Sequence, residues 1–172
     1  MKRATVPLLL STPLLTLAAT VALAASNPDQ SFFRHAAQAG MAEVKDAQLA
    51  QEKSSNQAVK DFAARMIQDH TMANDQLMSI AAMEDVKLPS MPSVAETAEH
   101  AKLDVLTGEA FDKAYIRGQL KAHHQAIALF TKEAQSGQDQ MAMMFAMQTL
   151  PTLKAHLRAA RMVAMQLGIA AK

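Results

Sequence analysis

The stretch QAVKDFAARMIQDHTMANDQLMSIAAM, residues 57–83, decides the fold. Apolar residues recur in it every three or four positions, which is the spacing of one face of an α-helix. The polar run 54–56 directly before it marks a break at which a new helix can begin. The stretch therefore predicts one long amphipathic helix, and His70 interrupts its apolar stripe.

The same periodicity on either side of this stretch predicts helices at 29–52, 109–135 and 139–167, with a shorter one at 94–106. Pro151 falls inside the last of them, where a proline is expected to kink the helix or divide it near Thr149. Half of the residues are apolar but only 4% are aromatic, and five glycines are too few for the turns of a β-sandwich. Four long amphipathic helices that must bury one another predict an all-α, antiparallel four-helix bundle.

Residues 1–24 have the features of a secretory signal peptide. Lys2 and Arg3 precede an uncharged, leucine- and alanine-rich run that ends in the small residues around Leu23. This arrangement predicts cleavage before Ala25, a bundle domain at 25–172 and a periplasmic location. The alternative is an uncleaved membrane anchor, but Pro7 and Pro13 disfavour a continuous spanning helix.

Composition narrows the range of partners. Without its predicted signal the chain has 15 basic and 16 acidic residues, and it contains no cysteine. We therefore expect no disulfide, no nucleic-acid binding and no membrane span after cleavage. We also find no nucleophile–base motif or nucleotide-binding loop, so the sequence does not indicate an enzyme.

His70, His123 and His156 interrupt the apolar stripes of three different helices, and Glu43 lies at the edge of the stripe of the fourth. A bundle points all four inward, where unpaired polar groups are costly. If the segment between the second and third long helices runs the full length of the bundle, as in ferritin-like folds, the four residues fall within roughly 6 Å of one axial level. A simple up-down-up-down bundle spreads them over roughly 12 Å, so the pattern favours the crossover topology.

Three imidazoles and a carboxylate suit zinc, copper or iron, with Asp69 as a carboxylate that orients one of the imidazoles. The alternative is a hydrogen-bonded polar layer that only fixes the register of the helices. Di-iron carboxylate bundles carry a glutamate three residues before each ligand histidine. Here those positions are Ile67, Leu120 and Leu153, so di-iron chemistry is not expected.

Thirteen methionines are a high count, and four of them lie between Met141 and Met147. Thioethers are soft ligands that suit Cu(I). Methionine is also a flexible filler of apolar cores, and this second interpretation is the better one from the sequence.

Several short stretches resemble one bacterial family, catalogued as domain of unknown function 4142 and often labelled an outer-membrane protein. They cover most of the chain after the signal: GMAEV at 40–44, VKDFA at 59–63, MIQDH at 66–70, LP at 88–89, FDKAY at 111–115, LF at 129–130 and LP at 150–151. The resemblance implies an exported ferritin-like bundle and no established activity. It also implies that Glu43, His70, His123 and His156 belong to a shared site. We therefore expect a periplasmic protein, binding a transition metal in metal handling or envelope stress, or serving as an envelope interaction module.

Overall fold

The computed structural model describes residue 27 and residues 29–170 and contains five helices in this part of the chain. They are α1 (Gln30–Lys53), α2 (Gln57–Met83), α3 (Val94–Asp104), α4 (Gly108–Ser136) and α5 (Gln140–Gln166). The all-α prediction is confirmed, and α2 has the predicted bounds. The predicted signal segment 1–24 lies outside the described residues.

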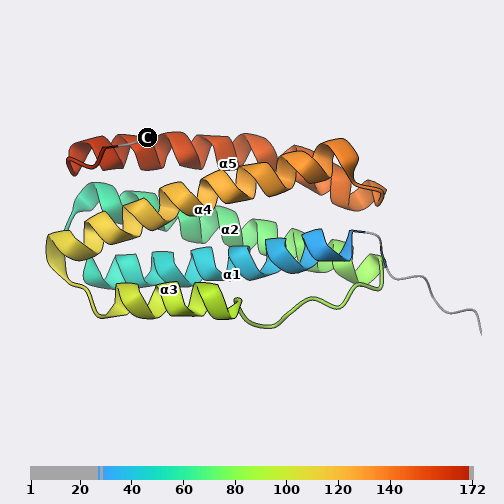
Figure 1. Cartoon of the computed structure of the whole chain (residues 1–172), viewed down its shortest axis with the longest axis horizontal. Coiled ribbons are helices and arrows are strands. Elements are labelled where there is room, and N and C mark those ends of the chain that lie inside the picture. The colour runs from blue at the N-terminus through green and yellow to red at the C-terminus, as the bar shows by residue number, and fades with distance from the viewer. Residues whose placement is uncertain (1–26, 28, 171–172) are drawn as a thin grey trace, which may run out of the picture.

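Four long helices form an antiparallel bundle (Figure 1). α1 packs on α2 and α4 packs on α5, while α1 also contacts α4 and α2 contacts α5. The segment from the end of α2 through α3 returns along the whole bundle, so α2 and α4 run in the same direction (Figure 1). The crossover topology that the axial positions of the polar residues favoured is therefore the one observed.

Local signals explain where these helices begin. Asn56 caps α2, because its side-chain oxygen accepts hydrogen bonds from the amides of Ala58 and Val59. Ser93 and Glu96 form a reciprocal capping box at the start of α3. α3 then lies against α1, which places this short helix on the outside of the bundle.

Pro151 does not divide α5, which is continuous over Gln140–Gln166, so division near Thr149 is a wrong prediction. The Pro151 ring is exposed, and so is the side chain of Met147 four residues earlier. Water can therefore hydrate the carbonyl that the proline leaves without an amide partner.

The core consists of two apolar clusters with a polar layer between them. The first apolar cluster surrounds Phe62 and Phe111, and the second surrounds Phe33 and Phe145. On α2, Met66 belongs to the first cluster, Leu77 belongs to the second, and His70 lies between them. Each of the other three long helices also contributes apolar residues to both clusters, on either side of one buried polar residue. These polar residues are Glu43 in α1, His123 in α4 and His156 in α5.

Gly40 lets α1 approach α2 closely at this level. A β-carbon at position 40 would lie 1.9 Å from the side-chain oxygen of Asn74. The glycine is one turn from Glu43 in α1, and the asparagine is one turn from His70 in α2. The close contact therefore brings together the two helices that carry these site candidates.

At the end of the bundle where α4 meets α5, acidic side chains are crowded. The Asp29 carboxylate accepts hydrogen bonds from the amides of Gln138 and Asp139, at 2.7 and 2.6 Å. Glu133 is buried beside them. Burial, together with repulsion from Asp29 and Asp139, raises the pKa of Glu133 to about 7.

Glu133→Gln is expected to remove part of the pH dependence of stability. Between about pH 4.5 and pH 7 the unfolded chain releases the Glu133 proton while the folded protein keeps it, so wild-type stability falls as pH rises through this window. Urea unfolding at pH 5 and pH 7.5 should show a larger loss for wild type than for the variant. Glu52→Gln, on the exposed face of α1, is the control, and equal pH dependence in wild type and Glu133→Gln would contradict this account.

Candidate metal centre

Three histidines from three helices converge between the two apolar clusters. One ring nitrogen from each of His70, His123 and His156 lies within 4.8 Å of the other two. The ring centroids are 5.3–5.6 Å apart, and all three side chains are buried. The spacing of the stripes placed these residues at one level, and the structure brings them together.

A hydrogen bond fixes which nitrogen of His123 carries the proton. It is made by the outer nitrogen, the one that does not face His156. Its Nδ1 lies 2.9 Å from the backbone carbonyl oxygen of Gln119, one turn earlier in α4. A carbonyl only accepts hydrogen bonds, so Nδ1 carries the proton and donates it. The Nε2 atom of the neutral ring is then left with a lone pair that faces the other histidines.

The position of the proton on His156 is fixed in the same way, by a hydrogen bond that runs from α5 to α2. Its Nε2 lies 2.7 Å from the carboxylate of Asp69 in α2, which also contacts Arg65 at 3.4 Å. Nε2 therefore donates to Asp69, and the lone pair of the ring is on Nδ1. Carboxylate and backbone-carbonyl partners on the outer nitrogen are the arrangement found behind metal-binding histidines.

The two lone pairs face each other. His123 Nε2 and His156 Nδ1 are 3.3 Å apart, but with both protons on the outer nitrogens neither atom can donate to the other. His70 adds a third unsatisfied group, because its Nε2 is buried and makes no hydrogen bond with the described residues. A cation that accepts all three lone pairs would satisfy the cluster.

The electrostatics keep these rings neutral. Burial lowers the pKa of His70 to about 3 and that of His123 to about 4, and it also lowers the pKa of His156 although Asp69 opposes the shift. Neutral imidazole is the form that binds metals. At neutral pH the three nitrogens are therefore ready to coordinate without first losing a proton.

The spacing suits a transition metal. Two nitrogens that each lie about 2.0–2.1 Å from a tetrahedral zinc ion are roughly 3.3–3.4 Å apart. The pair His123–His156 already has this separation. A side-chain movement that brings the His70 nitrogen, now within 4.8 Å of the other two, to the same separation would complete a three-nitrogen set with one coordination position open.

Glu43 is buried but does not join the three converging nitrogens. Its Oε2 accepts a hydrogen bond from the side-chain amide of Gln119 at 2.6 Å, and its Oε1 lies 4.0 Å from Nδ1 of His123. The carboxyl group thus faces the outer side of the His123 ring. Burial raises the pKa of Glu43 to about 8 against the opposing effect of the Gln119 amide, so the group is mostly protonated at neutral pH.

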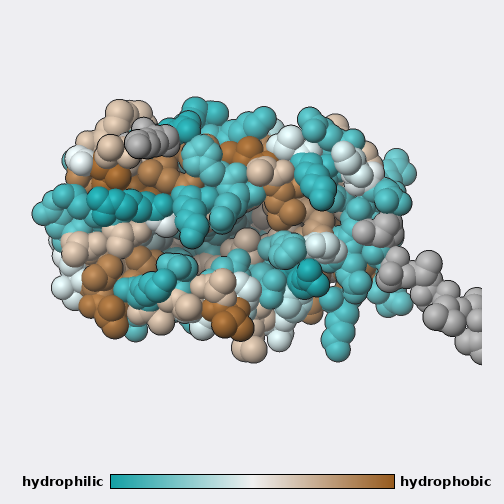
Figure 2. Space-filling view, in the orientation of Figure 1, coloured by the Kyte–Doolittle hydropathy of each residue, from teal (hydrophilic) through white to brown (hydrophobic). Residues whose placement is uncertain are grey.

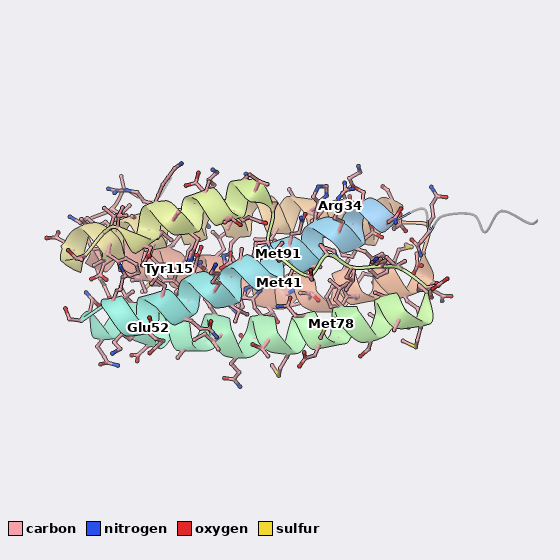
Figure 3. The ribbon with its side chains drawn as sticks, turned by 90° about the horizontal axis from the view of Figure 1, so that it is seen from below. Arg34, Met41, Glu52, Met78, Met91 and Tyr115 are labelled. Atoms are coloured by element: carbon pink, nitrogen blue, oxygen red, sulfur yellow. The ribbon has the colours of Figure 1, made fainter. Side chains whose placement is uncertain are left out.

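Sequence reasoning missed three further buried polar residues of α4. Gln119 supplies both the carbonyl that orients His123 and the amide that binds Glu43. The hydroxyl group of Tyr115 (labelled in Figure 3) and one oxygen of Asp112 are buried and make no hydrogen bond with the described residues. All three lie at helical spacing from His123, and this register was the signal that could have found them.

These features define an all-α four-helix bundle with a buried three-histidine cluster. Residues 14–163 match the family model of domain of unknown function 4142 (DUF4142), so the chain belongs to this family. The expected family is confirmed. No curated protein matches the chain at a significant level.

Two solved structures have a similar fold. The DUF305 protein from Streptomyces coelicolor superposes with a TM-score of 0.73 at 14% identity, covering 85% of this chain and 96% of that one. A DUF305 fragment from Deinococcus radiodurans gives a TM-score of 0.70 at 19% identity, covering 81% of this chain and 95% of that one. At these identities the likeness shows the fold alone.

Within residues 27 and 29–170, no helix combines the length and apolar character that crossing a membrane requires.

Proposed function

We propose that this protein is an exported metal-binding protein whose His70, His123 and His156 hold one divalent transition-metal ion. The observation that carries the proposal is the fixed direction of the lone pairs. Gln119 and Asp69 hold the protons of two rings on their outer nitrogens, so that the inner nitrogens, 3.3 Å apart, can only accept. A polar layer that only set helix register would instead pair donors with acceptors.

Imidazole ligands suit zinc, copper and iron, and the three-nitrogen set selects against magnesium and calcium, which prefer oxygen ligands. Ile67, Leu120 and Leu153 stand where a di-iron bundle has glutamates, so the centre is for one ion. Asp69 orients His156 in this account. Glu43 supports the ring of His123 through Gln119, and direct coordination by Glu43 would require its carboxyl group to pass to the inner side of that ring.

We place the protein in the periplasm, in metal handling or envelope stress. The support is the sequence of residues 1–24, where two basic residues precede a long apolar run and a small-residue cleavage pattern. Binding is favoured over catalysis because the ligands are almost completely shielded from solvent. His123 and His156 are each only 1% exposed.

Calorimetric titration of metal-free protein with zinc tests the proposal. We expect one equivalent to bind at neutral pH with little proton release, because burial keeps the three imidazoles neutral. The heat of binding should vanish when the cluster is already loaded. Magnesium at the same concentration is the matched control and should give no signal. Absence of zinc, copper and iron binding under these conditions would leave the register layer as the remaining interpretation.

A further inference from the structure

Methionine is the main large apolar residue on the surface of the part of the chain that the structure describes. Of the twelve methionines in the described residues, only Met66 is buried in the core, and eight are at least half exposed. Among residues 27 and 29–170, the other strongly exposed large apolar residues are two valines, and no leucine, isoleucine or aromatic residue joins them. The eight are Met72, Met78, Met83, Met91, Met144, Met147, Met162 and Met165.

This distribution overturns the interpretation of methionine as core filler. If the surface only tolerated apolar side chains, leucine would be expected there too, because it is abundant in this chain. Leucine and phenylalanine instead occupy the two apolar clusters. Eight of the ten strongly exposed large apolar side chains in the described residues therefore carry a thioether sulfur. Figure 2 shows hydrophobic residues mixed with hydrophilic ones along the upper edge of the molecule, where Figure 1 places α5.

Four of the exposed methionines form two pairs on α5. Met144 and Met147 are three residues apart, and so are Met162 and Met165, with exposed fractions of 50–60%. Residues at this spacing are neighbours on a helix surface, with β-carbons about 5–6 Å apart. The second pair follows the first by eighteen residues, which is five full turns, so both pairs lie on the same side of α5.

The donor chemistry differs from that of the histidine cluster. Thioethers are soft and uncharged, which suits Cu(I) and its analogue Ag(I) and not zinc or magnesium. Two long, flexible side chains at adjacent positions can turn both sulfur atoms toward one ion. Met162 also lines a shallow groove of about 390 Å³ between α2 and α5, together with Arg65, which contacts the Asp69 that orients His156. Met162 of the second pair therefore lies close to Arg65, the residue that contacts the Asp69 carboxylate behind His156.

We propose that the pairs Met144–Met147 and Met162–Met165 are two surface sites for a soft monovalent metal ion, Cu(I) or Ag(I). The partly buried Met141, three residues before Met144, can add a third sulfur to the first site. These sites stand independently of the histidine cluster, because they use other residues and another class of donor.

Titration of the purified protein with silver nitrate in chloride-free buffer, followed by NMR of ¹³C-methyl methionine, tests this proposal. We expect the methyl signals of the four paired methionines to shift first and to saturate at two equivalents, while buried Met66 is unchanged. The double variant Met162→Leu, Met165→Leu should lose one of the two equivalents. Leucine nearly conserves side-chain volume, so the fold should be retained.

The matched control is Met72→Leu with Met78→Leu. It removes the same number of exposed methionines from α2, at a spacing of six residues that does not pair them, and both equivalents should remain. Parallel shifts of all eight exposed methionines, or equal losses in the two double variants, would overturn the proposal. His123→Ala should leave the methionine shifts intact, which separates this test from that of the histidine centre.

Discussion

Replacing His123 by alanine is expected to abolish both stoichiometric metal binding and the stabilisation that the metal gives. A ligand that binds only the folded state stabilises it by about 2.7 kcal/mol at a hundred times its dissociation constant. For a domain of this size that corresponds to a rise in Tm of roughly 5–10 °C. Wild-type protein should show this rise when zinc is added, and His123→Ala should show none. Differential scanning calorimetry with and without zinc measures the effect.

His35→Ala is the control for this prediction. His35 is exposed on α1, far along that helix from Glu43, and its removal should leave the zinc-dependent shift intact. Circular dichroism establishes whether the metal-free His123 variant is folded. If it is not, His70→Gln provides a second test, because the amide is similar in size and polarity but is not an imidazole. A full zinc response in both cluster variants would place the binding site elsewhere.

Asp69→Ala is expected to weaken metal binding by about 10–100-fold without abolishing it, which is the usual effect of removing the partner of a ligand histidine. Asp69 does not contact the inner nitrogens. It accepts the Nε2 proton of His156 at 2.7 Å and so keeps the lone pair on Nδ1. Without it the ring can adopt the other tautomer and rotate. Competition against a fluorescent zinc chelator measures the change in affinity.

Asp61→Ala is a matched control for this variant. It removes the same charge from the same helix two turns earlier, where the exposed Asp61 accepts a hydrogen bond from Gln57. Its effect on affinity should be small, because an exposed charge at that distance is screened by salt. Equal losses in the two variants would mean that Asp69 acts through net charge and not through His156.

The helices of this fold were predictable because their apolar stripes are long and regular. The bounds of α2 agree with the prediction, while the others shift by one or two residues, since final turns depend on caps that propensity does not determine. The crossover topology was predictable from the polar residues, because only this topology brings Glu43, His70 and the other two histidines to one axial level. Division of the last helix at Pro151 was wrongly predicted, because the effect of a proline depends on whether its helix face meets solvent.

The candidate site was predictable only to the level of helix faces. Periodicity brought the three histidines together, but it could not tell on which side of His123 the Glu43 carboxyl group would lie. That position depends on the side-chain torsions of Glu43 and on Gln119, which binds it. Asp69 was expected to orient an imidazole, and the structure shows that it reaches across from α2 to His156 and not to its neighbour in sequence.

X-ray absorption spectroscopy of the zinc-loaded protein tests the central claim most directly, because it reports which atoms surround the ion. We expect a first shell that includes three imidazole nitrogens at about 2.0–2.1 Å, with no sulfur. The multiple-scattering signal of imidazole should fall by a third or vanish in His70→Gln. A shell of oxygen atoms alone, or one unchanged by that substitution, would contradict the three-histidine centre.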